Sequence, residues 1–441
     1  MEIWKMNTRI DVWHRLRLLR AQAIRQSVNT AVPVLERLRT SGAALPNCAE
    51  DYLQLAQQAT GLDDFGYRGL TEGLEQLLAS AINDAGLNYI GRKSFRLDTL
   101  RLLGNLLWLT EERKQIPEIR DIEISAPVFI MGLPRTASTF LHSLLMQDPA
   151  HRAPRIWEVT YPCPQSALDR SGDDRRARMQ RNLLWLDFLE PDFQSAYPAT
   201  SESPQECSEI LSNVFASLRF DTTYDIPSYL AWMDGRSHEN AYTFHRRFLQ
   251  HLHHHNGGGR WILKCPDHVF FYNDILRVYP DARLIVTHRD PSKVIPSVAA
   301  LTMILQGLFS DHTEATRVAN RVLDRWVLGS QRIIDIARST HALQKNVLHV
   351  FYEELTADPL ATLGRIYAFL GSPLSPEVRA RVRNYLTHPG AGGYHSNRYA
   401  RHFKTLLPAP LVRERFHEYI DYFGVIPAHQ TRERKRSNRS F

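Results

Sequence analysis

The chain has 441 residues, of which 43% are hydrophobic and 23% are charged, enough for one large domain or two to three ordinary ones with a sizeable core. Its formal net charge is +7 at pH 7, but the stretch from Arg432 to Arg439 holds five basic residues and one acidic residue and supplies most of that excess. The remainder is close to balanced, which disfavours a globally basic body that binds nucleic acid and indicates a globular protein with a basic tail.

The cysteine pattern and the lack of long apolar runs exclude further classes. Cys48, Cys163, Cys207 and Cys265 are scattered without a Cys-x-x-Cys pair, so neither a disulfide scaffold nor a zinc framework is expected. The N-terminus has no apolar stretch of the signal-peptide type, and no apolar run reaches the roughly 18 residues of a transmembrane helix. We therefore predict a soluble protein of a reducing compartment, the cytoplasm.

The N-terminal part is predicted to be helical, because apolar residues such as Leu74, Leu77, Leu78 and Ile82 recur at three- and four-residue steps. The polar stretch at 111–123 ends this pattern. The sequence thus predicts a mainly helical region over 1–122, an α/β domain over 123–425 and a disordered basic tail over 426–441.

From residue 124 onward, short strand-like segments alternate with helical patterns. The predicted strands end at Met131, Lys264, His288 and Phe351. Asp290-Pro291 and Asp358-Pro359 each place a capping carboxylate before a proline, which predicts two helix starts. The alternation is typical of an α/β fold with a parallel sheet buried on both faces. Ligands in such folds bind at the carboxyl ends of the strands, so we expect functional residues in the loops after them.

The first of these loops has the composition of an anion site. The strand ending at Met131 runs into Gly132, Leu133, Pro134, Arg135, Thr136, Ala137, Ser138 and Thr139, and then into an apolar helix. A tight turn before a helix directs backbone amides and the positive end of the helix dipole at a ligand, while Arg135 adds a charged donor fork and the hydroxyls add further donors. A Walker A loop would need Gly and Lys where this chain has Ala137 and Ser138, so ATP or GTP hydrolysis is not expected.

A second cluster follows the strand that ends at His288. Arg289 comes directly after the strand, and Ser297 lies about two turns into the next helix, so both can reach one anionic group. Taken alone, this turn is also what a capped helix start with a surface arginine looks like.

Together, the loop at 132–139 and the pair Arg289 and Ser297 resemble the PAPS-dependent sulfotransferases (PAPS, 3′-phosphoadenylyl sulfate), especially their large bacterial-type branch. Similar segments at 148–158, 261–268, 279–291 and 352–371 extend the resemblance over most of residues 50–425. It implies a P-loop NTPase-like sulfotransferase fold and PAPS as co-substrate. The residues implied around the 5′-phosphosulfate are Gly132, Pro134, Arg135, Thr136, Ala137, Ser138 and Thr139, and those on the 3′-phosphate are Arg289 and Ser297.

Sulfuryl transfer to a hydroxyl requires that the acceptor lose a proton, that the sulfuryl group be held in line and that charge on the departing phosphate be stabilised. We assign Arg135 to the 5′-phosphate and the sulfuryl oxygens. The resemblance implies that Lys264, at its strand end, contacts the leaving group. This chemistry requires no metal, and because the sequence shows no metal-ligand motif we expect none.

Two residues compete for the role of general base. Glu158 is similar in position to the catalytic glutamate of the tyrosylprotein sulfotransferases, and burial beside Trp157 would raise its pKa toward neutrality. His268, four residues after Lys264, is the rival, since cytosolic sulfotransferases use a histidine shortly after the corresponding lysine. Each also has a structural interpretation, Glu158 as the partner of an arginine and His268 as a packed residue at a helix start.

The remaining features are less specific. His251, His253, His254 and His255 precede Asn256 and three glycines, and we interpret them as incidental residues of a mobile surface loop. The stretch from Asp192 to Gly259 is predicted to contain helices with a long surface excursion, and segments 157–163 and 192–239 are expected to shape the pocket for a hydroxyl acceptor (a small molecule, lipid, glycan or peptide). Two other functions stay open, a P-loop-type nucleotide or small-molecule kinase and a non-catalytic nucleotide-binding protein.

Overall fold

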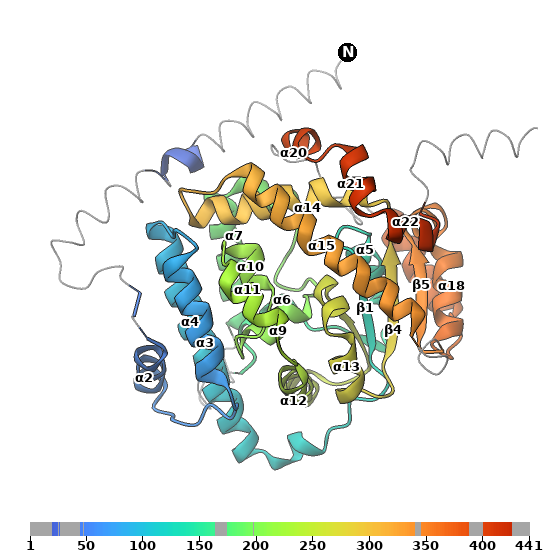
Figure 1. Cartoon of the computed structure of the whole chain (residues 1–441). Coiled ribbons are helices and arrows are strands. Elements are labelled where there is room, and N and C mark those ends of the chain that lie inside the picture. The colour runs from blue at the N-terminus through green and yellow to red at the C-terminus, as the bar shows by residue number, and fades with distance from the viewer. Residues whose placement is uncertain are drawn as a thin grey trace, which may run out of the picture.

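The computed structural model describes residues 20–24, 26, 45–46, 48–163, 174–196, 198–339, 345–387 and 400–425. The predicted basic tail at 426–441 lies outside these residues. Within them, a five-stranded sheet is surrounded by helices, and the N-terminal helices lie on the opposite side of the molecule from the last strand (Figure 1).

The sheet is parallel and has the strand order β2-β3-β1-β4-β5. Its strands are β1 (Val128–Gly132), β2 (His151–Arg152), β3 (Arg260–Lys264), β4 (Arg283–His288) and β5 (Val347–Phe351). The four predicted strands are confirmed, and each ends within one residue of its predicted end; β2 is too short to show a periodic pattern. Ile130 is in register with Lys264 on one side and with Ile285 on the other, so β1, β3 and β4 end at the same edge.

Both faces of the sheet are buried, because alternate residues of β1 pack into two different clusters. Val128 and Ile130 belong to a cluster formed with α5 (Ser138–Leu145), α18 (Pro359–Phe369) and α19 (Pro376–Thr387). Phe129 and Met131 belong to a larger cluster to which α12 (Glu239–Asn256), α13 (Tyr272–Val278), α14 (Pro291–Phe309) and α15 (Ala315–Arg338) contribute. The predicted α/β fold with a doubly covered parallel sheet is confirmed.

The two helix starts predicted from Asp-Pro pairs are also confirmed. The Asp290 carboxylate accepts a hydrogen bond from the backbone N–H of Ser292 at 2.9 Å and caps α14. The Asp358 carboxylate accepts one from Ala361 at 2.9 Å and caps α18.

The N-terminal region contains α2 (Ala49–Thr60), α3 (Leu70–Asn83), α4 (Tyr89–Gln115) and the 3₁₀ helix η1 (Pro117–Asp121). Leu74, Leu77 and Leu78 of α3 are buried as predicted, but Ile82 is 50% exposed and Ala81 takes the buried position instead. These helices share the larger cluster with the sheet, so they are packed against the α/β part through a common core.

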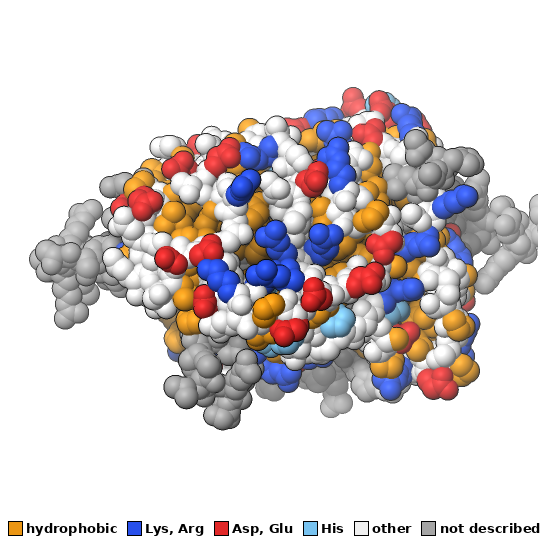
Figure 2. Space-filling view, turned by 90° about the horizontal axis from the view of Figure 1, so that it is seen from below, with side chains coloured by type: hydrophobic (Ala, Val, Ile, Leu, Met, Phe, Trp, Pro, Cys, Tyr) orange, Lys and Arg blue, Asp and Glu red, His pale blue; other side chains and the backbone are white. Residues whose placement is uncertain are grey.

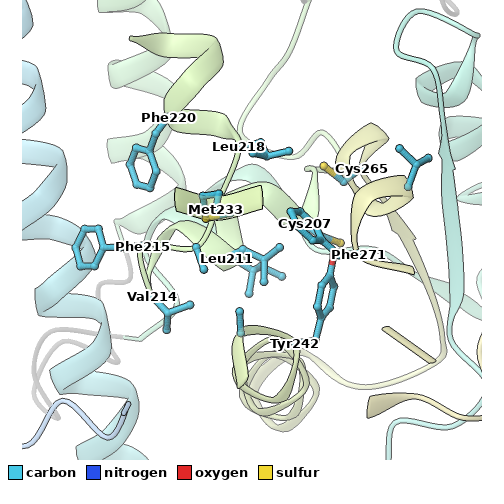
Figure 3. Close-up of a cluster of buried hydrophobic side chains, with 14 of the residues drawn as sticks. Cys207, Leu211, Val214, Phe215, Leu218, Phe220, Met233, Tyr242, Cys265 and Phe271 are labelled. Atoms are coloured by element: carbon cyan, nitrogen blue, oxygen red, sulfur yellow. The ribbon is translucent and has the colours of Figure 1, made fainter. Parts of the chain in front are cut away.

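The remaining helices are α6 (Ile156–Thr160), α7 (Arg175–Leu189), α8 (Pro191–Ala196), α9 (Cys207–Ser212), α10 (Arg219–Thr223), α11 (Pro227–Asp234), the 3₁₀ helix η3 (Pro266–Phe270), α17 (Tyr352–Ala357), α20 (Ala400–Leu406), α21 (Ala409–Arg415) and α22 (His417–Phe423). The prediction of a long surface excursion in this part of the chain is wrong for residues 207–218, which are buried throughout. Cys207, Leu211 and Phe215 from this stretch gather with Tyr242 and Cys265 in one apolar cluster (Figure 3). This cluster fixes the start of α9 and the end of β3, which both matter for the site below.

One helix in the described part of the chain, α14, is long and apolar enough to cross a bilayer by length and composition. More than half of it is buried inside the protein, and its cap at Asp290 and its contacts with α15, α20 and α21 are those of a core helix.

Candidate active site

A cavity of about 840 Å³ opens at the carboxyl ends of β1, β3, β4 and β5. It is lined by residues that follow each of these strands and by α9, α14 and α15. The structure brings seven of the predicted site residues to its wall: Pro134, Arg135, Ala137, Ser138, Thr139, Arg289 and Ser297. The site therefore lies at the edge of the sheet where a parallel α/β fold places its ligands.

The loop from β1 to α5 has an unusual backbone. The φ angle is 138° at Gly132, 60° at Arg135 and 64° at Ala137. A Cβ atom at Gly132 would lie 2.3 Å from the carbonyl oxygen of Thr287, so glycine is what allows β1 and β4 to approach here. Left-handed residues in such a turn direct backbone N–H groups into a concave anion site at the start of the following helix.

The hydroxyl groups of the loop divide into two kinds. Thr136 is fully buried, and its Oγ1 donates to the carbonyl oxygen of Leu133 at 2.7 Å and lies 2.6 Å from Oγ1 of Thr287. This hydroxyl braces the loop from inside, so the expectation that it faces a ligand is wrong. Ser138 and Thr139 line the cavity and are the hydroxyls available to a bound anion.

Two guanidinium groups stand at one wall of the cavity. Nε of Arg135 donates to Oγ of Ser297 at 3.2 Å. Arg289 donates to the backbone carbonyl of Arg135 at 2.9 Å, and its guanidinium lies 3.8 Å from the ring centroid of Tyr352. These contacts bring together groups from three elements that are far apart in sequence, and they form a surface suited to a ligand with more than one negative charge.

Lys264, at the end of β3, reaches the same loop. Its side chain is 1% exposed, and its Nζ lies 3.3 Å from Oγ1 of Thr139 and 2.5 Å from Oε1 of Glu206. Glu206 is the N-cap residue of α9 and lines the cavity with 28% of its side chain exposed. A positive charge and a carboxylate that solvent can reach therefore stand next to the predicted anion site.

Asp267 is a second carboxylate at the cavity wall, three residues after Lys264. Burial, reinforced by the negative charge of Glu206, raises the pKa of Asp267 to about 7. Carboxylates with such perturbed pKa values are frequent in functional sites.

Glu158, our preferred base, is placed elsewhere. Its side chain is fully buried, Oε1 accepts a hydrogen bond from Arg152 at 2.9 Å, and Oε2 accepts one from the backbone N–H of Arg155 at 2.9 Å. It is not among the described residues that line the cavity. The geometry supports its structural interpretation, the partner of an arginine and a cap of α6.

His268 also points away from the cavity. It is fully buried in η3, its Nδ1 lies 2.7 Å from the hydroxyl of Tyr242, and its ring packs edge-on against Phe129. Burial, together with the nearby His245 and Lys264, holds the pKa of His268 well below its ordinary range. These contacts correct its placement as a rival base and match its interpretation as a packed residue.

The interpretation of the histidine tract as a mobile surface loop is wrong for His251. The last turns of α12 continue through His255, and His251 is 2% exposed, with Nδ1 2.7 Å from Oε2 of Glu112. An 18-residue helix that buries one face decides which histidines of the tract point inward.

Part of the cavity wall is apolar and includes Phe140, Phe193, Leu301, Leu305 and Trp326. Residues from the segment 192–239 line the cavity as expected, but none of the described residues at 157–163 does. Sequence reasoning missed Glu206 and Asp267. The position of Asp267 just after β3 was a usable signal, whereas nothing local marked Glu206.

Known proteins that resemble this chain in sequence share one activity. A sequence model described as "Sulfotransferase family" matches residues 127–376. The omega-hydroxy-beta-dihydromenaquinone-9 sulfotransferases Stf3 of Mycobacterium bovis and Mycobacterium tuberculosis are each 26% identical over 315 residues, which cover 68% of this chain and 75% of the relative.

Two solved structures are similar over nearly their whole length. Sulfotransferase STF9 of Mycobacterium avium is 27% identical with a TM-score of 0.76 and covers 87% of this chain and 99% of its own. Sulfotransferase STF1 of Mycobacterium tuberculosis is 28% identical with a TM-score of 0.71 and covers 83% of this chain and 98% of its own.

Proposed function

Because this chain belongs to the sulfotransferase family and transfers sulfuryl groups, we propose that its donor is PAPS and that its acceptor is an alcohol carried on an apolar body. The observation that carries the donor proposal is the meeting of two anion-binding groups in one cavity, the loop at 132–139 and the pair Arg289 and Ser297. The kinase alternative is not favoured. A cytoplasmic location remains part of the proposal.

We assign the two ends of PAPS to the two groups. The amides of the loop, with Ser138 and Thr139, receive the 5′-phosphosulfate at the start of α5. Arg289 and Ser297 receive the 3′-phosphate, and Arg135 lies between the two sites because it contacts both Ser297 and Arg289. The ring of Tyr352 below Arg289 favours one orientation of its planar donor fork.

We assign the general base to Glu206 in place of Glu158. In the transfer step the acceptor oxygen forms a bond to sulfur, the bond from sulfur to the 5′-phosphate oxygen breaks, and the acceptor proton passes to Glu206. Lys264 stabilises the charge that develops on the departing phosphate. Its contacts with Thr139 and Glu206 support both roles, because they set the ammonium group between the loop and the base.

The acceptor class follows from the apolar wall. This part of the cavity wall has no charged groups to bind a sugar or a peptide backbone but can pack against a hydrocarbon or aromatic group. Its residues are Phe193, Leu301, Leu305 and Trp326. The relatives named for a menaquinone derivative bearing an omega-hydroxyl support the same class of acceptor.

The donor assignment is tested by binding of 3′-phosphoadenosine 5′-phosphate (PAP) and of AMP, which lacks the 3′-phosphate. Arg289→Ala should weaken PAP binding roughly 10- to 100-fold and leave AMP binding nearly unchanged, because one charged hydrogen-bonding partner is lost only for PAP. Arg277→Ala, which removes an arginine from the surface of α13, is the matched control. Equal losses for both nucleotides, or stronger thermal stabilisation by ATP than by PAP, would refute the assignment.

The base and the acceptor are tested by PAP release from PAPS without added metal. Glu206→Gln should lower kcat by roughly 100-fold or more while PAP still binds, whereas Asp267→Asn should have a smaller effect. Long-chain alcohols should be better acceptors than short polar ones, and Leu301→Gln should raise KM for the long-chain alcohols only. A fully active Glu206→Gln enzyme would return the search for the base to Asp267.

A further inference from the structure

We propose that the chain binds one zinc ion away from the active site, with Glu112, Cys163 and His251 as its ligands. The donor atoms of these three residues all lie within 4.8 Å of one another. Thiolate, imidazole and carboxylate are the three ligand types that zinc takes in proteins, at bond lengths of about 2.0–2.3 Å. A bound ion would take the place of the hydrogen bonds that join these donors, with a small separation of His251 from Glu112.

The ligands come from three separate elements. Glu112 lies in the last turn of α4, Cys163 follows α6, and His251 lies near the end of α12. Oε2 of Glu112 is 2.7 Å from Nδ1 of His251 and 3.4 Å from Sγ of Cys163. A metal ion bound to side chains from three distant elements would hold those elements together, because each ligand would bond to the same ion.

His255, from the next turn of α12, supports the same carboxylate. Its Nε2 lies 2.7 Å from Oε1, the second oxygen of the same Glu112 carboxylate. Two histidines four residues apart face the same side of a helix, a spacing that recurs in zinc sites. His255 thus acts as an outer-shell partner that fixes the orientation of the Glu112 carboxylate.

The charged residues that line a cavity beside the cluster are mainly basic, so the negative charge that would hold a cation comes from Glu112 and a thiolate at Cys163. The neighbouring Arg113 directs its guanidinium to Oε1 of Gln250 at 2.9 Å, so the charge of Glu112 is shared with imidazoles and a thiol. This cavity of about 370 Å³, lined by Phe65, Arg113 and His251, reaches one member of the cluster, His251. The underside of the molecule, where α12 lies, displays histidine side chains beside a group of lysines and arginines (Figure 2).

The site has a structural consequence for the enzyme. The helix α12 ends at residue 256, and β3, which ends at Lys264, begins only four residues later. An ion that holds the end of α12 against α4 would therefore also hold the start of the strand that carries Lys264. The buried Cys163 links the same point to the segment after α6. Zinc should therefore raise thermal stability without taking part in sulfuryl transfer.

The test uses the full chain without an added histidine tag. Zinc affinity is measured by competition with a chromophoric chelator at neutral pH, and Co²⁺ is used as a spectroscopic substitute. The wild type should bind one equivalent of either metal, release protons on binding, and show a thiolate-to-cobalt charge-transfer band in the near ultraviolet. Zinc should also raise its melting temperature.

Variants with matched controls locate the ion. Cys163→Ser should lose the cobalt band and, like His251→Ala, weaken zinc binding by more than about 100-fold, since loss of an outer-shell partner alone costs 10- to 100-fold. Cys48→Ser and His254→Ala replace an exposed cysteine and an exposed histidine of the same tract and should leave binding within a few-fold of wild type. PAP binding by each variant shows that it is folded.

Two results would overturn the proposal. One is a folded wild type that binds no zinc at stoichiometric concentrations. The other is metal binding that survives Cys163→Ser but is lost in His254→Ala, because the ion would then sit on the exposed part of the histidine tract.

Discussion

Replacing Lys264 by methionine tests whether its buried charge serves transfer or only holds Glu206 in place. The change keeps most of the side-chain volume and removes the ammonium group, which lies 2.5 Å from Glu206 and 3.3 Å from Thr139. Loss of one donor aimed at developing negative charge lowers kcat by roughly 100- to 1,000-fold, equivalent to about 3–4 kcal/mol of transition-state stabilisation.

The effect on stability should be much smaller. Glu206 keeps 28% of its side chain exposed, so water can take the place of the lost partner, and the buried ammonium group no longer has to be desolvated. We expect the free energy of unfolding to change by less than about 2 kcal/mol. A large loss of kcat with a small loss of stability is therefore the signature of a catalytic role.

The assay is single-turnover PAP release at saturating PAPS and acceptor, with unfolding in urea measured on the same preparations. Lys293→Met is the matched control, because Lys293 is an exposed lysine of α14 that also lines the cavity. Its kcat should fall by no more than a few-fold. A Lys264→Met enzyme with near-normal kcat and reduced stability would show that Lys264 is only the structural partner of Glu206.

Three further changes test other parts of the structure. Gly132→Ala should destabilise the fold by about 3 kcal/mol or more in urea unfolding, because its Cβ would lie 2.3 Å from the carbonyl oxygen of Thr287. The control Gly104→Ala, whose Cβ would have no atom within 4 Å, should stabilise α4 slightly. Equal effects of the two changes would contradict the close approach of β1 and β4. Glu158→Gln should lower the free energy of unfolding by about 3 kcal/mol, because it leaves Arg152 buried without its anionic partner. The kcat of the folded variant should stay near normal. An inactive variant of normal stability would restore Glu158 as the base. Because the pKa of Asp267 is raised from 3.8 to about 7, the folded state binds more protons than the unfolded state between about pH 4 and pH 7. The free energy of unfolding should therefore fall as pH rises through that window, by at most about 1.4 kcal/mol per pH unit. Asp267→Asn should flatten this slope, and parallel pH profiles of stability for the two proteins would refute the raised pKa.

Several features of this protein could be predicted from short stretches of sequence. The strand ends at Lys264 and His288, the caps at Asp290 and Asp358 and the glycine at the end of β1 are local features, set by a few neighbouring residues and by the backbone they favour. Parallel strands then bring their carboxyl ends to one edge, so strand prediction was enough to place the loop at 132–139 near Arg289.

Side-chain direction was the first thing that sequence could not supply. Glu158 and His268 have the right residue types near the right strands, yet the fold turns both into the interior, where Arg152 and Tyr242 occupy their polar atoms. The same limit applies to Ile82, which fits the helical period of α3 but falls just outside its buried face.

Pairing between residues far apart in the chain was the second property that the sequence could not supply. Glu206 is 58 residues from Lys264, and Glu112 is 139 residues from His251, so neither pair shares a local pattern. The seven excess positive charges counted at the outset gave no indication of either. The sequence by itself determined the strands, the anion loop and the family, because these depend on neighbours along the chain. Only the tertiary structure decided which carboxylate faces Lys264 and which histidine is buried, because those depend on packing between elements that are distant in sequence.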